Sequence, residues 1–180
     1  MKFTTREIVF TAMFTAVTAV LSILTIPMPS GVPITLQTFA IALCGFVLGC
    51  KLGTVSVLLY TLIGLIGVPV YAGMTAGPGV LFGASGGYIF GFILMAFFCG
   101  MGMRFSNKLM HLLFGIIGLA CCHIIGVIQL KFVLSMTWMG ALMAGTVPFL
   151  VKDVISVAGA YAVALAVKKA LKAAQYQEIG

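Results

Sequence analysis

The sequence predicts an all-α polytopic membrane protein with six transmembrane helices, and three observations lead to this class. Hydrophobic residues make up 62% of the 180 residues and charged residues only 7%, whereas soluble domains are about half apolar and a quarter charged. The mean hydropathy is +1.25. The apolar residues also form long runs of the length that a bilayer requires. So few charges cannot cover a water-soluble surface, which excludes soluble enzymes, disordered chains and coiled coils.

The apolar runs divide a single domain, residues 1–180, into six helices of up to about 20 residues. The first begins near Glu7 and ends where three prolines occur within the seven residues from Pro27 to Pro33, because proline cannot continue a helix. The second and third are short, ~24 Å each at helical rise, and a Gly- and Pro-rich loop, residues 68–79, precedes the fourth. The predicted spans are residues 7–26, 34–49, 52–67, 83–103, 109–130 and 147–167.

The basic residues predict the orientation of these spans. If the N-terminus is inside, the cytoplasmic segments carry eight of the ten Lys and Arg residues, whereas Lys131 is outside and Lys152 lies within the last span. This is the positive-inside pattern, so we expect both termini to be cytoplasmic in a multi-pass protein of the plasma membrane. The net charge of +7 then reflects topology rather than a nucleic-acid partner, because the basic residues form no stripe.

Asp153 is the acidic residue that we expect to carry function. Glu7 and Glu178 lie near the two ends of the chain, but Asp153 lies inside an apolar span, where a charge costs ~2.5–3.5 kcal/mol and is kept for pairing or function. Helical rise places it ~22 Å from Lys168 at the inner surface, and therefore close to the outer loops. A structural pair with Lys152 is the alternative, although adjacent helical side chains point ~100° apart and are poorly arranged for direct contact.

Polar residues at the start of the second span are expected to complement this carboxylate. Thr35 and Gln37 are two positions apart, so they converge only if the segment begins extended, as residues beside Pro33 tend to be. A Gln amide both donates and accepts, which suits a neutral polar ligand. The alternative is a helix cap by Thr35 and an interhelical bond from Gln37.

The fourth span begins with Gly83-Ala-Ser-Gly-Gly-Tyr88, which supports more than one interpretation. Gly83, Gly87 and Gly91 recur every four residues and predict close helix packing, although backbone N–H groups at a helix start also bind carboxylates. The first four residues match the nucleophile motif of rhomboid intramembrane proteases, which require a histidine base beside Ser85.

The Cys and His residues show no metal-ligand spacing, so we expect no metal site.

Four separated motifs together resemble the biotin-specific substrate-binding components (BioY family) of energy-coupling factor (ECF) transporters. They are Pro33-Ile-Thr-Leu-Gln37, Gly67-Val-Pro-Val-Tyr-Ala-Gly73, Gly83-x-x-Gly-Gly-Tyr-Ile-Phe-Gly-Phe92 and Pro148-Phe-x-x-x-Asp153. The resemblance implies a protein without enzymatic activity or cofactor that captures biotin from outside with high affinity. It also implies a transmembrane coupling subunit, docked on Ala12 and Ala16 of the first helix, and two ATP-hydrolysing subunits.

The chain departs from the family pattern in three places. Ala84 and Ser85 stand where members often have Pro and Thr, Lys152 stands where many have Gly or Ala, and no Asn follows the third span. These departures concern the polar partners of the ligand and leave the class unchanged.

The resemblance and the chemistry of biotin suggest roles for the candidate residues. Asp153 would accept from a ureido N–H, Gln37, Thr35 or Ser85 would donate to the ureido oxygen, and aromatic rings would line an apolar slot. Lys152 is favoured for the ligand carboxylate, with Lys131 and the backbone N–H groups of residues 73–79 or 83–87 as alternatives. The expected substrate-binding residues are Asp153, Lys152, Gln37, Thr35, Tyr71, Gly73, Ser85, Gly86, Gly87, Tyr88 and Phe149.

Three other functions are weighed against this interpretation. An intramembrane serine protease would pair Ser85 with His123, but the rhomboid base belongs on the last helix and His123 is on the fifth. A proton- or sodium-coupled carrier would use Asp153, but no inverted pair of broken helices is visible. The third is a substrate-binding component for another small vitamin. The sequence leaves open whether the protein uses a shared energising module, uses a dedicated one, or acts alone as a homo-oligomer.

Overall fold

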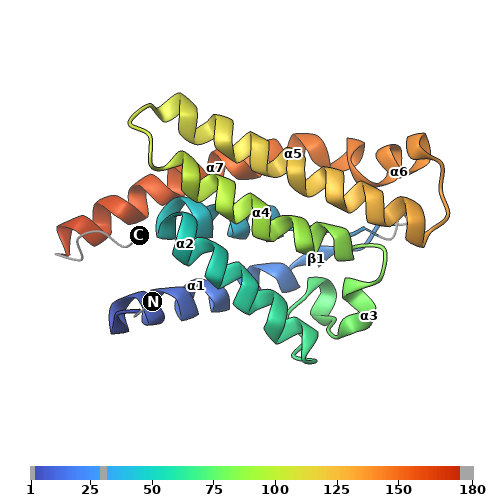
Figure 1. Cartoon of the computed structure of the whole chain (residues 1–180), viewed down its shortest axis with the longest axis horizontal. Coiled ribbons are helices and arrows are strands. Elements are labelled where there is room, and N and C mark those ends of the chain that lie inside the picture. Colours follow the sequence, from blue (N-terminus) through green and yellow to red (C-terminus); the bar gives the residue numbers. More distant parts are fainter. Residues whose placement is uncertain (1–2, 29–31, 175–180) are drawn as a thin grey trace.

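The computed structural model describes residues 3–28 and 32–174, which form a helical bundle (Figure 1). Lys2, one of the eight basic residues predicted to be cytoplasmic, and Glu178 lie outside the described residues. The predicted all-helical class is confirmed, with only two short strands added. The elements are α1 (Thr5–Ile23), β1 (Thr25–Ile26), β2 (Ile34–Thr35), α2 (Gln37–Leu65), a 3₁₀ turn (Ala72–Met74), α3 (Pro78–Leu81), α4 (Gly86–Gly102), α5 (Lys108–Val133), α6 (Trp138–Gly145) and α7 (Val147–Ala173).

Four helices, α1, α2, α5 and α7, are long and apolar enough to cross a membrane, and α4 is a shorter apolar helix. The predicted count of six spans is not confirmed by helix length. The difference arises in part at α2, which covers both the second and the third predicted span.

Helix α2 consists of two limbs, residues 37–48 and 50–65, that join at Gly49. Gly49 has φ 76° and ψ −179°, a backbone conformation that is essentially restricted to glycine. The Gln37 Nε2 atom donates to the Tyr60 hydroxyl at 2.8 Å, although a straight helix would separate these residues by roughly 35 Å. A Cβ atom on Gly53 would lie 2.9 Å from the Cys44 carbonyl oxygen. The chain therefore reverses at Gly49, and the two limbs pack side by side.

The other helix ends differ from the predicted bounds for local reasons. Helix α1 ends at Ile23, because Thr25–Ile26 pairs antiparallel with Ile34–Thr35. Residues 82–85 form turns, so α4 begins at Gly86. Helices α5 and α7 run past the predicted ends, to Val133 and Ala173. The small strand pair ties the end of α1 to the start of α2, beside Gln37.

Close packing of α4 on α5 depends on the predicted glycine face. A Cβ atom on Gly87 would lie 2.6 Å from the Ile125 carbonyl oxygen, and one on Gly91 would lie 2.6 Å from the Cys122 Cα atom.

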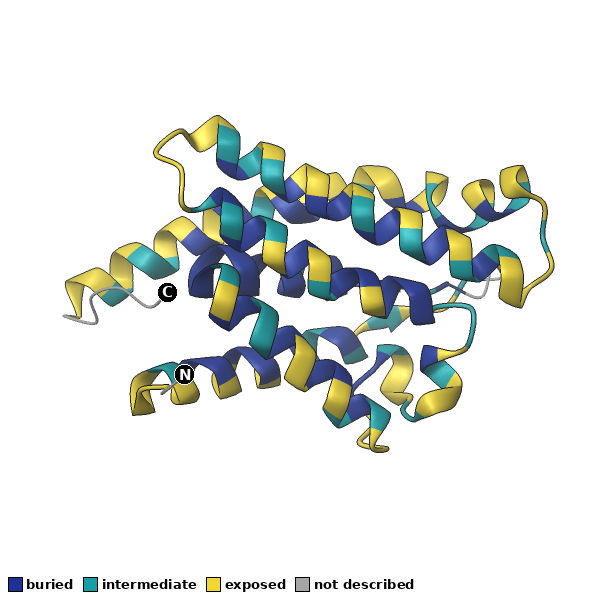
Figure 2. Ribbon diagram, viewed as in Figure 1, coloured by how far each residue is buried: buried dark blue, intermediate teal, exposed yellow. Residues whose placement is uncertain are grey.

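Buried residues face the middle of the bundle, where nearly all of residues 38–48 are buried, and exposed residues follow the outer sides of α1, α5 and α7 (Figure 2). Many of the exposed residues are apolar, as a lipid-facing surface requires.

Candidate functional site

A cavity of about 370 Å³ lies between β2, α2, the 71–85 segment, α4, α5 and α7. This volume is in the usual range for small-molecule sites, about 300–1,000 Å³. Eight of the eleven predicted substrate-binding residues line it: Thr35, Gln37, Tyr71, Ser85, Tyr88, Phe149, Lys152 and Asp153. The chain reversal at Gly49 and the β1–β2 pair bring the start of α2 opposite the start of α7, and this brings residues more than 100 positions apart to one cavity.

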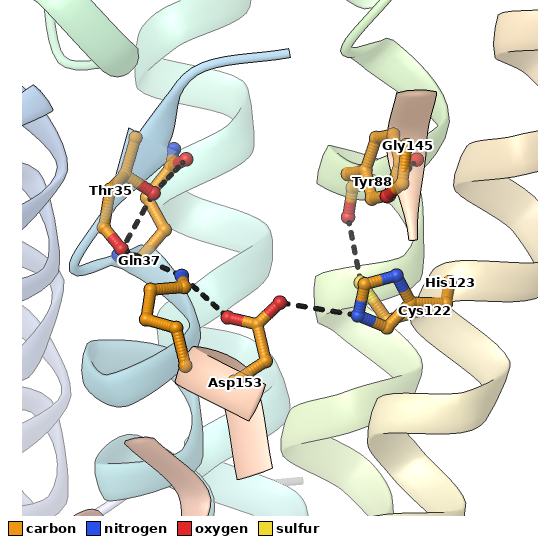
Figure 3. Close-up of polar contacts among 8 residues, drawn as sticks. Thr35, Gln37, Tyr88, Cys122, His123, Gly145 and Asp153 are labelled. Atoms are coloured by element: carbon orange, nitrogen blue, oxygen red, sulfur yellow. Dashed lines mark hydrogen bonds and ion pairs between the residues drawn. The ribbon is translucent and has the colours of Figure 1, made fainter. Parts of the chain in front are cut away.

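Asp153 is buried at 4% exposure and contacts two basic side chains (Figure 3). Its Oδ2 atom lies 3.2 Å from His123 Nε2, and its Oδ1 atom lies 2.5 Å from Lys152 Nζ. Among the described residues, Oδ1 has the ion pair but no aligned hydrogen bond. A carboxylate oxygen offers more than one lone pair, so Oδ1 can accept a further hydrogen bond beside the Lys152 ammonium group.

The direct Lys152–Asp153 contact shows that the sequence expectation of poor pairing was wrong. Adjacent Cβ atoms do diverge on a helix, but the four-carbon stem of lysine lets the ammonium group bend back to its neighbour. The same Nζ atom donates to the Thr35 carbonyl oxygen at 3.0 Å. Lys152 therefore spans from α7 to β2 and holds the two sides of the cavity together.

Thr35 and Gln37 converge as the extended start of the second span predicted. Thr35 lies in β2, and its hydroxyl donates to Gln37 Oε1 at 3.0 Å and accepts from the Gln37 backbone N–H at 3.2 Å. Gln37 Nε2 donates to Tyr60, which sequence reasoning did not include. The interhelical bond that was weighed as the structural alternative is thus present, and Gln37 still lines the cavity.

His123 is an ionisable residue of the cavity that the sequence prediction did not assign to the ligand, since it was considered only as a protease base. It is 7% exposed, lines the cavity and stacks edge-on against the Tyr88 ring at 5.9 Å between centroids. Its Nδ1 atom has no hydrogen-bond partner among the described residues. A polar residue in the middle of an apolar span is the same signal that identified Asp153. The pairing of His123 with Asp153 required the three-dimensional structure, because 30 residues separate them.

Two tyrosines form walls of the cavity and use their hydroxyl groups for structure. Tyr88 donates to the Gly145 carbonyl oxygen at 2.7 Å, and Tyr71 donates to the Thr61 carbonyl oxygen at 2.6 Å. Burial raises the pKa of Tyr71 to about 12, so this phenol stays protonated and remains a donor at physiological pH. Both rings present apolar surface to the cavity.

Gly73, Gly86 and Gly87 do not line the cavity. Gly73 is exposed with φ 65°, and a Cβ atom on Gly86 would collide with the Leu81 carbonyl group. Gly87 contacts α5, as described above. The turn geometry at Gly73 and the close packing at Gly86 and Gly87 explain why these positions are glycine.

Comparison with known proteins identifies the family. The sequence profile of the BioY family matches residues 1–173. The chain belongs to the BioY family.

Two relatives illustrate the extent of the similarity. The biotin transporter BioY of Thermotoga maritima is 38% identical over 165 residues, which are 91% of this chain and 96% of the relative. The probable biotin transporter BioY of Pyrococcus horikoshii is 35% identical over 162 residues, 88% and 94% of the two chains. With several apolar helices, this BioY-family chain is a multi-pass protein of the cell membrane.

The fold is also that of a solved structure. The crystal structure of the S-component for biotin from an ECF-type ABC transporter aligns with a TM-score of 0.84 at 27% identity, covering 93% of this chain and 95% of the other.

The relatives are transporters, and none of the described hydrogen bonds supplies a protease base. His123 contacts Asp153, and His111 contacts Tyr161 and the Phe105 carbonyl group, so neither pairs with Ser85.

The residues predicted to dock a coupling subunit lie on another face. Ala12 and Ala16 are exposed on α1 and line an apolar hollow of about 210 Å³ between α1 and the second limb of α2. Small side chains at this spacing leave a flat surface on which another membrane helix can pack closely. No residue of this hollow lines the candidate ligand cavity.

Proposed function

We propose that this BioY-family protein is the biotin-binding component of an ECF uptake transporter, which captures biotin from outside the cell. One observation carries the proposal: a buried carboxylate, paired with His123 and Lys152, lines a cavity beside the uncharged polar groups of Thr35 and Gln37. Biotin matches this arrangement, because it offers ureido N–H donors, a ureido oxygen, an apolar thioether ring and a carboxylate tail.

The Asp153–Lys152 pair suggests how the ureido ring is held. A cyclic urea carries an N–H donor directly beside its carbonyl oxygen, and the ion pair places an acceptor directly beside a donor. Asp153 Oδ1 would accept the ureido N–H, and Lys152 would donate one of its three N–H groups to the ureido oxygen while still bonding Thr35. In this arrangement Lys152 serves the ureido ring rather than the ligand carboxylate, which lies at the other end of biotin.

His123 then acts as a positioning residue. By donating from Nε2 to Oδ2, it would orient the carboxylate so that Oδ1 faces the ligand. The apolar ring would lie among Tyr71, Tyr88 and Phe149. Ser85 and the backbone N–H groups of the 73–79 segment are the groups left for the biotin carboxylate.

The finer topology belongs to the same proposal: six crossings, with α1, each limb of α2, α4, α5 and α7 counted once. The limbs are ~18 and ~24 Å long, short for a bilayer core of ~30 Å, but other helices surround the first limb. The start of α1 and the end of α7 lie at the same end of the bundle (Figure 1), which supports termini on one side. Reporter fusions at both ends that differ in sidedness would contradict this topology.

Energy would come from partner subunits rather than from a cofactor of this chain. We propose that a transmembrane coupling subunit packs on the Ala12–Ala16 hollow and connects the protein to two ATP-hydrolysing subunits. The paired substitution Ala12→Leu and Ala16→Leu is expected to abolish uptake while leaving biotin binding by the purified protein unchanged. The matched control is Met13→Leu, which lies on the same helix outside the hollow. Unimpaired uptake by the paired variant would overturn this docking site.

The function is tested by equilibrium binding of labelled biotin to the purified protein. We expect saturable binding at one site, competed by unlabelled biotin and not by other vitamins. Competition by a different vitamin alone would assign the chain to another substrate. If the protein cleaved a membrane substrate and Ser85→Ala abolished that cleavage, the protease function would be favoured instead.

A further inference from the structure

A second, larger groove lies along α5, α6 and α7 and shares only Leu119 and His123 with the candidate ligand cavity. Its volume is about 500 Å³, and ten of its twelve lining residues are apolar. Ile124, Trp138 and Leu150 are 59%, 54% and 47% exposed within it. On a soluble protein such a groove would be an aggregation site, but on a multi-pass membrane protein it opens toward lipid. The lining residues are Ile116, Leu119, Ala120, His123, Ile124, Val127, Ile128, Trp138, Leu142, Thr146, Leu150 and Val154.

A cation lies next to this apolar groove. Lys131, in the last turn of α5, places its Nζ atom 4.9 Å from the Trp138 ring centroid and 4.5 Å from that of Phe132. Among the described residues, no carboxylate lies within salt-bridge distance of it. Lysine and tryptophan at the end of a spanning helix occupy the headgroup level of a bilayer, so the groove combines an apolar floor with a positive charge at the depth of lipid phosphates.

We propose that this groove binds one anionic phospholipid, with an acyl chain along α5, α6 and α7 and the phosphate at Lys131. The occupant comes from the outer leaflet of the surrounding bilayer, because the topology proposed above places Lys131 outside, and a lysine ammonium group pairs with a lipid phosphate. This ligand site is distinct from the biotin site and goes beyond the transport function. It also contacts that site from behind, because Leu119 and His123 line both the groove and the ligand cavity.

The test is native mass spectrometry of the purified full-length protein, titrated with phosphatidylglycerol or phosphatidylcholine of identical acyl chains. We expect one phosphatidylglycerol to bind about fivefold more tightly than phosphatidylcholine, the preference that one basic residue near the surface supplies. Lys131→Gln should remove that preference, whereas Lys108→Gln at the other end of the same helix should keep it. Equal affinity of wild type for both lipids, or an unchanged preference in Lys131→Gln, would overturn the phosphate contact.

The acyl-chain contact has its own matched pair of variants. Ala120 is exposed in the groove, so Ala120→Phe fills it without disturbing the core, and Ala162→Phe adds the same ring to an exposed position of α7 outside it. Ala120→Phe should lose the bound lipid of either headgroup, and Ala162→Phe should retain it. Retention by Ala120→Phe would show that the lipid lies elsewhere. If Ala120→Phe fails to fold, Lys131→Gln, which changes only a surface side chain, still decides the proposal.

Discussion

The buried hydroxyl groups of α1 and the Asp153–His123 pair beside the ligand cavity differ in how they are satisfied, although both lie in apolar helices. In α1, the hydroxyls of Thr15, Thr18 and Ser22 each donate to the backbone carbonyl four residues earlier, at 2.8, 2.9 and 2.6 Å. Around the cavity, Asp153 Oδ1 and His123 Nδ1 have no aligned hydrogen bond among the described residues. The α1 hydroxyls are satisfied by the backbone of their own helix and have a structural role, whereas the Asp153 carboxylate lines the cavity and is held by the basic side chains of Lys152 and His123.

Asp153→Asn is the substitution that tests this comparison most severely. It keeps the shape but removes the charge, weakens the bond to a ureido N–H and leaves Lys152 without its counter-ion. Truncating one partner of a buried charge pair costs about 2–5 kcal/mol, so the Kd for biotin should rise about 30-fold or more. Equilibrium binding of labelled biotin measures the change. An unchanged Kd would remove Asp153 from the site.

Lys152→Gln sharpens the comparison by separating the two ends of the ligand. A hydrogen bond to a charged group contributes about 1.5–3 kcal/mol, so the variant should bind biotin at least about tenfold more weakly. If Lys152 serves the ureido oxygen, biotin methyl ester should lose affinity by the same factor as biotin. A loss confined to free biotin would instead assign Lys152 to the carboxylate, as the sequence first suggested.

His123→Leu should weaken biotin binding less, by a factor of about five to ten, because the histidine acts through Asp153. His123→Gln retains an N–H donor and should recover part of the loss. A double-mutant cycle gives the decisive readout: in the Asp153→Asn background, His123→Leu should have little further effect, since coupled residues are not additive. Full additivity of the two losses would contradict a positioning role.

Thr18→Val on α1 should have the smallest effect and completes the comparison. Thr18 is fully buried, and its hydroxyl bonds the Phe14 carbonyl and Cys44 Sγ at 2.9 and 3.2 Å. Interhelical hydrogen bonds in membranes contribute about 0.6 kcal/mol on average, so thermal unfolding in detergent should shift slightly. The Kd for biotin should not change. A large loss of biotin affinity would show that satisfied polar residues of α1 also act on the site.

The site was predictable where a residue's chemistry is unusual for its surroundings. Asp153 was conspicuous because it is the only acid away from the two ends of the chain, and Thr35 and Gln37 follow a proline that favours extended backbone. Gly86 and Gly87 do not line the cavity, and their sequence did not separate the two roles, since a glycine at a helix start serves packing and ligand approach equally well. His123 was missed because its partner lies on another helix.

The sequence by itself determined the membrane class, the helical runs, the turn near Gly49 and the presence of one intramembrane acid, because hydrophobic length, glycine and charge are local properties of the chain. Only the tertiary structure decided that the limbs of α2 reverse against each other, that Lys152 bends back onto Asp153 while reaching Thr35, and that His123 completes the carboxylate's environment. These contacts join residues up to 117 positions apart, and their geometry depends on how helices pack and how long side chains bend, which no local pattern encodes.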